Sequence, residues 1–95
     1  HLHDDLRAAE RWVAAADAAP AHAEAGRWLL EAGLALSKVG LDDRAANVLE
    51  RAVPHPDQAV AACLALGRVK MADDPAGAYA WYDRALADGA EGGAQ

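Results

Sequence analysis

Two pairs of adjacent carboxylates are the first residues of this chain that suggest chemistry. Asp42 and Asp43 form one pair, and Asp73 and Asp74 form the other. Paired carboxylates can act as general acid and base or bind a cation. Both pairs, however, come where a helix is expected to begin, and a carboxylate there accepts hydrogen bonds from free backbone N–H groups. We therefore expect these residues to cap helices rather than to catalyse a reaction or bind calcium.

The histidines and the single serine lack the neighbours that metal binding or nucleophilic catalysis requires. His22 and His55 have no His, Cys or Glu three or four residues away, which is the spacing of metal ligands on a helix. Ser37 is the only serine, threonine is absent, and no histidine–acid pair is placed by the sequence to activate the hydroxyl. The sequence therefore predicts no catalytic residue, no metal site and no cofactor, and it places both histidines at the surface.

The only cysteine lies in an apolar run. Cys63 falls within residues 60–66, and the chain has no second thiol with which to form a disulfide. A small, soft side chain in such a run is typical of a helical core. We expect a buried, inert thiol.

Composition favours a single all-α domain. The chain has 95 residues, enough for one core, and no phenylalanine. More than a quarter of the residues are alanine and β-branched residues are scarce, a composition that favours helix over sheet.

Charge and hydropathy exclude two kinds of partner. Acidic residues outnumber basic ones 15 to 9, the net charge is −6, and no cluster of lysine and arginine interrupts this balance. Nucleic acid is therefore not an expected partner. No apolar stretch approaches the ~20 residues of a membrane span, and nothing resembles a signal peptide. We expect no membrane insertion and a cytoplasmic setting.

Turn-forming residues divide the chain into five expected helices. Pro20, Gly40, the segment 54–56 and the pair Asp74-Pro75 separate stretches with helical periodicity, and Gly89 is expected to end the last one. The helices are expected over residues 4–18, 22–38, 42–53, 57–71 and 75–89. The connection at Gly40 is short, so the second and third helices should lie antiparallel.

The second half of the chain repeats the first. The glycine recurs with an offset of 34 and the following apolar positions with an offset of 33: Gly33, Ala45, Leu49, Ala52 and Val53 return as Gly67, Ala78, Tyr82, Ala85 and Leu86. A repeat of this length is typical of helix–turn–helix arrays. A glycine inside a helix costs about 1 kcal/mol relative to alanine, so we expect Gly33 and Gly67 to permit close packing, opposite Ala45 and Ala78.

These features resemble the tetratricopeptide repeat. The first copy would comprise Leu29, Ala32, Gly33, Leu36, Ala45, Leu49 and Ala52, and the second Cys63, Leu66, Gly67, Lys70, Ala78, Tyr82 and Ala85. Ala8, Trp12, Ala15 and Pro20 fit an orphan second helix of the motif. The resemblance implies one domain over residues 1–90, with an orphan helix at 4–18, repeats at 22–53 and 57–88, and a flexible tail at 91–95. An unrelated antiparallel helical bundle is the alternative.

The resemblance also implies a groove for a partner. The family's groove is lined by the first helix of each repeat, which here gives Arg27, Leu30, Leu34 and Ser37 together with Leu64, Arg68 and Met71. An apolar floor with two arginines would suit a peptide or helix that brings apolar side chains and one or two carboxylates. The lysine and asparagine pairs with which some family members hold a terminal carboxylate are absent. A simpler interpretation assigns the leucines to the core and the arginines to the solvated surface.

The aromatic residues suggest a second interface. Trp12 and Tyr82 occupy the repeated large apolar position and are expected in the core. Trp81 and Tyr79 lie on other faces of the last expected helix, which has no following helix to cover it. We expect this end to bind a further repeat or a second copy of the chain.

Together these patterns predict a non-catalytic protein–protein interaction module, a scaffold or adaptor that binds a peptide or helix of a partner protein. The alternative is a helical regulatory or ligand-sensing domain, or an accessory domain of a larger multidomain protein. An enclosed pocket would favour the alternative, whereas an open face would favour the adaptor.

Overall fold

The computed structural model describes the backbone of residues 2–93 and the side chains of residues 4–89, and it confirms the all-α prediction. No strand occurs in the described backbone. Its five helices are α1 (Leu2–Ala18), α2 (Ala25–Lys38), α3 (Asp42–Ala52), α4 (Ala59–Lys70) and α5 (Pro75–Gly93).

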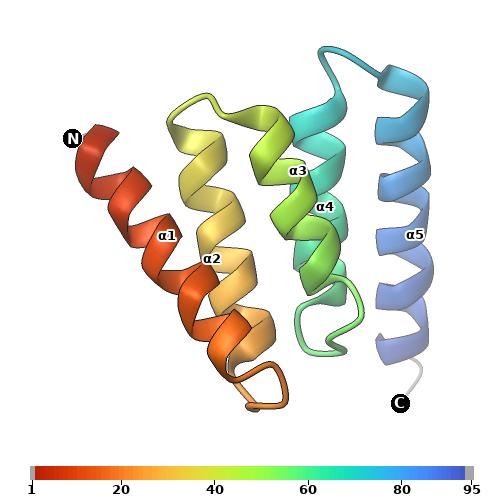
Figure 1. The fold of residues 1–95 in the computed structure, drawn as a ribbon. Helices are drawn as coiled ribbons and strands as arrows, with labels where there is room; N and C mark the ends of the chain where they lie inside the picture. Colours follow the sequence, from red (N-terminus) through yellow and green to blue (C-terminus); the bar gives the residue numbers. More distant parts are fainter. Residues whose placement is uncertain (1, 94–95) are drawn as a thin grey trace.

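The helices form an open row (Figure 1). Each helix packs against the next one along the chain, and α2 also contacts α4. The row measures 38 × 32 × 17 Å, with α1 and α5 at opposite ends. Arg51 of α3 donates a hydrogen bond to Asp17 of α1, but both side chains are half exposed, so this ion pair adds little stability.

Two predicted helix boundaries have the expected chemistry. Gly40 adopts a positive φ of 83° after α2, the Leu41 N–H donates to the Leu36 carbonyl (2.9 Å), and the Gly40 N–H donates to the Ser37 carbonyl (3.1 Å). These two bonds satisfy carbonyls that the end of α2 leaves free. Asp74 precedes Pro75, and its Oδ1 accepts a hydrogen bond from the Gly77 N–H (3.1 Å), so the predicted cap of α5 is confirmed.

The capping prediction for the first acidic pair is wrong in its geometry. Leu41 occupies the N-cap position of α3, and no side chain caps this end. Asp42 and Asp43 lie instead in the first turn, where a negative charge is favoured by the helix dipole without a capping hydrogen bond.

The starts of α2 and α4 and the end of α5 differ from expectation by two to four residues. Helix α2 begins at Ala25 rather than at His22, because His22 Nδ1 accepts a hydrogen bond from the Glu24 N–H (2.9 Å) and holds a turn there. The turn after α3 likewise delays α4 to Ala59. Helix α5 continues past Gly89 to Gly93, since Gly89 does not adopt the positive φ that ends α2. Residues 94–95 of the expected tail lie outside the described residues.

The repeated glycines pack against large side chains rather than against the small ones that were expected. A Cβ atom at Gly33 would lie 2.5 Å from the Leu49 side chain, and one at Gly67 would lie 2.5 Å from the Tyr82 ring. The predicted close packing of α2 on α3 and of α4 on α5 is therefore confirmed, but the partners are Leu49 and Tyr82, not Ala45 and Ala78. In both pairs the glycine, which has no side chain, makes room for the large residue that follows the expected alanine by one helical turn.

The core contains mostly alanine and leucine. Its largest fully buried side chains are Leu36, Leu49, Leu66 and Cys63. Each buried leucine contributes roughly 1.5–3 kcal/mol relative to an exposed one. Burial also raises the pKa of the Cys63 thiol, which agrees with the expected inert cysteine.

Candidate partner-binding surface

Two neighbouring helices present exposed apolar side chains on one face, which we call the α2/α4 face. It consists of the outward residues of α2 and α4, namely Arg27, Glu31, Leu34, Lys38, Val60, Leu64 and Arg68. These residues recur every three or four positions, and that spacing places them on one side of each helix. Leu34 is 39% exposed and Leu64 44% exposed. Leu34 and Arg68 line one hollow, and Leu64 stands one turn before Arg68 on α4, so the two leucines belong to neighbouring parts of one surface.

An open hollow of about 450 Å³ lies at the α1 side of this face. It is lined by Asp5, Ala8 and Trp12 of α1, by Glu31, Leu34, Ala35, Ser37 and Lys38 of α2, and by Arg68 of α4. Three of the predicted groove residues, Leu34, Ser37 and Arg68, therefore meet in one place. The hollow combines apolar side chains with two cations and two carboxylates, a mixture that suits a polar peptide with apolar anchors.

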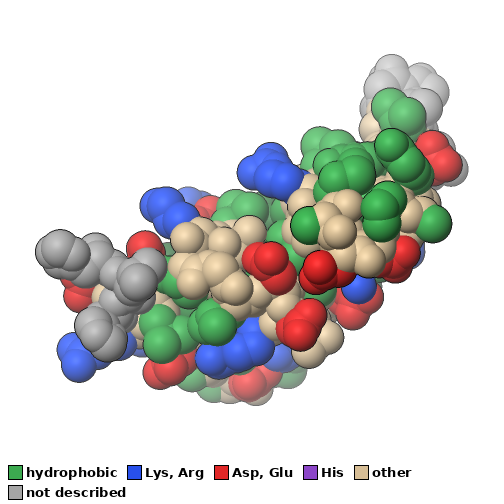
Figure 2. Space-filling view, turned by 90° about the horizontal axis from the view of Figure 1, so that it is seen from above, with side chains coloured by type: hydrophobic (Ala, Val, Ile, Leu, Met, Phe, Trp, Pro, Cys, Tyr) green, Lys and Arg blue, Asp and Glu red, His purple; other side chains and the backbone are tan. Residues whose placement is uncertain are grey.

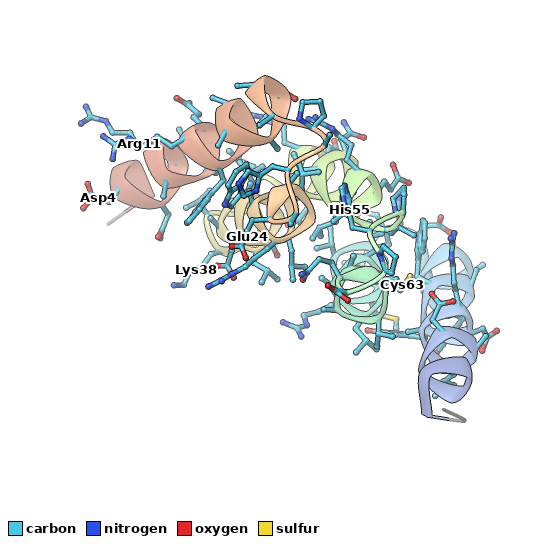
Figure 3. The ribbon with its side chains drawn as sticks, turned by 90° about the horizontal axis from the view of Figure 1, so that it is seen from below. Asp4, Arg11, Glu24, Lys38, His55 and Cys63 are labelled. Atoms are coloured by element: carbon cyan, nitrogen blue, oxygen red, sulfur yellow. The ribbon has the colours of Figure 1, made fainter. Side chains whose placement is uncertain are left out.

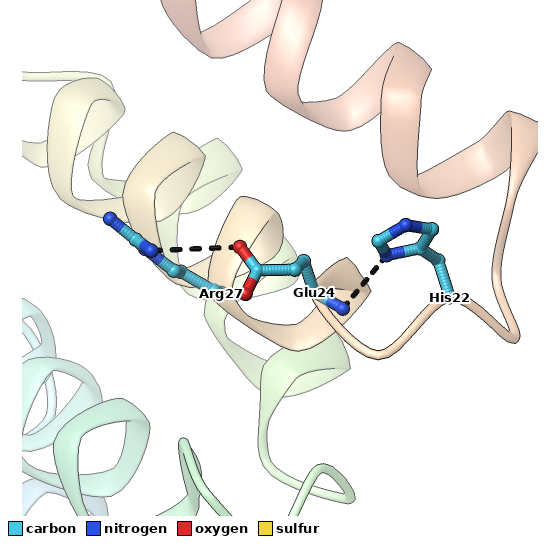
Figure 4. Close-up of polar contacts among 3 residues, drawn as sticks. All are labelled: His22, Glu24 and Arg27. Carbon is cyan, nitrogen blue, oxygen red and sulfur yellow. Dashed lines mark hydrogen bonds and ion pairs between the residues drawn. The ribbon is translucent and has the colours of Figure 1, made fainter.

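Other predicted groove residues stand farther from the hollow. Arg27 lies near the start of α2, where it forms a surface ion pair with Glu24 (3.5 Å), beside the turn that His22 holds (Figure 4). Its side chain is 63% exposed, so this pair leaves the guanidinium accessible. Leu64 is exposed on α4 outside the residues that line the hollow.

Three of the predicted partner-binding residues, Leu30, Met71 and Trp81, are buried or half-buried. Leu30 is only 9% exposed and belongs to the core, because it faces the residues of α3 and α4 that pack against α2. Met71, at the end of α4, is half-buried. Trp81 is also half-buried: it packs against the core, and the Arg84 guanidinium lies 5.8 Å from the centre of its ring. Among the described side chains of α5, the large apolar ones that are exposed are Tyr79 and Leu86.

Sequence reasoning missed several residues of the hollow. Trp12 was expected in the core, but it is 37% exposed and lines the hollow. Its spacing from Ala8 and Ala15 matches the spacing of Leu49 and Tyr82 from their alanines, and spacing alone does not show how far a residue is covered. Glu31 and Lys38 could have been found, because they stand three and four residues from Leu34 on the same helix face.

The remaining candidate chemistry forms no site. The two acidic pairs come together with Lys70 around a small hollow of about 60 Å³, but no group of three or more His, Cys, Asp or Glu in the described part of the chain could hold a metal ion. His55 was expected at the surface but is half-buried, since its ring packs where a Cβ at Gly26 would lie. The described helices also include none with the length and apolarity needed to cross a bilayer.

Comparison of the chain with protein-family models, with curated proteins and with solved structures finds no match. The geometry of the face and the internal repeat therefore provide the basis for assigning a function.

Proposed function

We propose that this chain is a non-catalytic protein-interaction module whose α2/α4 face binds an extended or helical peptide of a partner protein. The observation that carries the proposal is the exposure of Leu34 and Leu64 on two adjacent helices. A leucine that is about two-fifths exposed retains apolar area that a partner can remove from water, at roughly 25 cal/mol per Å².

The charges beside these leucines indicate the chemistry of the peptide. Lys38 and Arg68 line the hollow next to Leu34, although the chain as a whole has a net charge of −6. A carboxylate of the peptide could reach either cation while its apolar side chains contact the leucines. Asp5 and Glu31 line the same hollow and would repel a carboxylate of the peptide, so it would have to lie on the side of Lys38 and Arg68.

The resemblance to the tetratricopeptide repeat supports the same assignment, since the open row, the paired glycines and the α2/α4 face agree with a helical-repeat adaptor. An enclosed ligand pocket would favour a ligand-sensing domain instead. The hollow beside Trp12 opens to solvent, which suits the side chains of a macromolecular partner better than an enclosed small molecule.

Selection of peptides from a random displayed library tests the proposal. We expect the recovered peptides to combine apolar residues with Asp or Glu, and to lose binding to a Leu34→Asp, Leu64→Asp double variant. The matched control is Leu86→Asp, which changes an equally apolar and more exposed leucine at the other end of the row. Circular dichroism would verify that all variants keep their helicity. Peptides that bind the double variant normally and lose binding to Leu86→Asp would overturn the proposal.

A further inference from the structure

Helices α1, α3 and α5 carry the same three-residue pattern, with unequal burial. We call these residues the seam of each helix: Ala8, Trp12 and Ala15 in α1; Ala45, Leu49 and Ala52 in α3; Ala78, Tyr82 and Ala85 in α5. All three seam residues of α3 are 0% exposed. In α5 the alanines are buried and Tyr82 is half-buried, whereas in α1 the alanines are half-buried and Trp12 is 37% exposed.

The covered seams show what fits against this pattern. The preceding helix, α2 or α4, packs on each of them antiparallel and presents a glycine to the large seam residue, Gly33 to Leu49 and Gly67 to Tyr82. A Cβ on either glycine would meet that side chain at 2.5 Å. Trp12 is larger than either residue, so a helix that covers the α1 seam needs a residue at least as small there.

The α1 seam has the shape of an unfilled site of this kind. An open hollow of about 380 Å³ lies over it, lined by the three seam residues and Arg11. Arg11 projects from α1 at the end of the row away from α5 (Figure 3).

Arg11 distinguishes the α1 seam from the other two. Arg11 stands one residue before the large seam residue Trp12. The corresponding residues are Val48 in α3 and Trp81 in α5, and both pack against the core. Val48 lines a hollow with Leu36, which stands three residues after Gly33. In a helix docked on the α1 seam in the same way, the residue three positions after the glycine that faces Trp12 would lie beside Arg11. A carboxylate at that position would complement the guanidinium.

We propose that the α1 seam docks one amphipathic helix of a partner protein, antiparallel to α1, with glycine or alanine opposite Trp12 and an acidic residue three positions later. This site adjoins the α2/α4 face, because Ala8 and Trp12 line both hollows. Arg11 and Ala15 line only the hollow over the α1 seam, and Leu34 lines only the other one.

The chain supplies its own probe. A peptide of residues 59–71 with the change Lys70→Glu carries Gly67 and an acidic residue three positions later. A cross-link between positions 61 and 65, on the side of the helix opposite Gly67, keeps the peptide helical, and circular dichroism would verify this. The peptide contains no tryptophan, so the three indole N–H signals of the ¹⁵N-labelled protein report on Trp12, Trp28 and Trp81 separately once Trp12→Phe and Trp81→Phe identify two of them. We expect a saturable shift of the Trp12 signal with the Trp81 signal unmoved.

Two matched changes test the shape and charge of the site. The same peptide with Gly67→Leu should bind roughly tenfold more weakly or worse, because the added side chain would meet Trp12. Arg11→Glu in the protein should invert the preference at peptide position 70, so that the unchanged Lys70 binds better than Glu. The Leu34→Asp, Leu64→Asp variant should still dock the helix, which separates this proposal from the function of the α2/α4 face.

Four results would overturn the proposal. The first three are a Trp12 signal that a helical peptide does not shift, equal affinity of the glycine and leucine peptides, and a shift confined to the Trp81 signal. The fourth is a concentration-dependent shift of Trp12 without any peptide, which would show that a second copy of the chain covers the seam.

Discussion

The two glycine-centred helix pairs differ in how completely the row covers them. In the first pair, Leu49 fills the space at Gly33 and is fully buried, because α1 and α4 pack on either side of α2 and α3. In the second pair, Tyr82 fills the space at Gly67 but stays half-buried at the end of the row. The same sequence pattern thus gives a closed interior seam or a half-open terminal one, depending on the neighbouring helix.

The outer side of α5 shows the consequence of that difference. Tyr79 and Leu86 occupy the positions that Ala46 and Val53 hold in α3. The α3 residues are 7% and 6% exposed, whereas Tyr79 is 61% exposed and Leu86 72% exposed. Figure 2 shows apolar side chains gathered at this end of the molecule. Helix α4 packs on α3, whereas no described helix follows α5, and the exposure of Tyr79 and Leu86 agrees with this difference.

The largest effect is expected from Gly33→Leu, which places a side chain against fully buried Leu49. We expect the free energy of unfolding to fall by roughly 2 kcal/mol or more, because neither helix can move without disturbing its other neighbour. Urea denaturation followed by circular dichroism measures this loss. Gly89→Leu is the matched control, since a Cβ at Gly89 meets nothing within 4 Å and stability should hold or rise. Equal stability of both variants would contradict the packing of α2 on α3.

Gly67→Leu makes the corresponding change in the second helix pair. The added side chain meets the Tyr82 ring, which is half-buried and can turn toward solvent, so we expect a loss of about 1 kcal/mol. The same denaturation experiment gives the value. A loss larger than that of Gly33→Leu would show that the terminal pair is the more tightly packed one.

The helix starts in the two pairs should also differ. Asp74→Ala removes the hydrogen bond from the Gly77 N–H and should cost roughly 0.5–2 kcal/mol. Asp42→Ala removes only a charge from the first turn of α3, where no side chain caps the helix, and should cost less, about 0.3–1 kcal/mol at low salt. Thermal unfolding at low and high salt separates the two cases, because only the Asp42 effect should disappear in high salt. A salt-sensitive Asp74 effect would argue against the capping bond.

The smallest expected effect is the pH dependence of stability that comes from Cys63. It tests whether this thiol is buried in the second helix pair. Burial raises the pKa of its thiol above the ordinary value of 9.0, so the neutral thiol stabilises the folded chain below pH 9. That contribution should be lost as the pH rises from about 9 through the folded-state pKa. Cys63→Ala should remove this alkaline loss, while a thiol reagent at pH 8 should label the native chain far more slowly than the unfolded one. Rapid labelling of the native chain would contradict a closed core beside α5.

Much of the fold followed from local signals. Gly40, Asp74 and Pro75 define boundaries through backbone conformation and capping, which depend on nearby residues alone. The pairing of the helices followed from the repeated glycines. The extension of α5 past Gly89 did not, because glycine permits a helix end without requiring one.

The candidate site was less predictable because exposure depends on neighbours distant in sequence. Leu30 and Leu34 stand one turn apart on α2, yet the first is 9% and the second 39% exposed. Helical periodicity places both on similar faces, and only the position of α4 decides which one it covers. Trp12 was misplaced for the same reason, since its pattern matched the buried Leu49 while its surroundings did not.

Chemical-shift mapping of a selected peptide on the ¹⁵N-labelled chain shows whether the α2/α4 face binds it. We expect saturating peptide to shift the backbone signals of Leu34, Ser37, Leu64 and Arg68 and to leave those of Tyr79 and Leu86 in place. Shifts confined to Tyr79, Leu86 and their neighbours on α5 would contradict it, and would assign recognition to the end of the row rather than to the α2/α4 face.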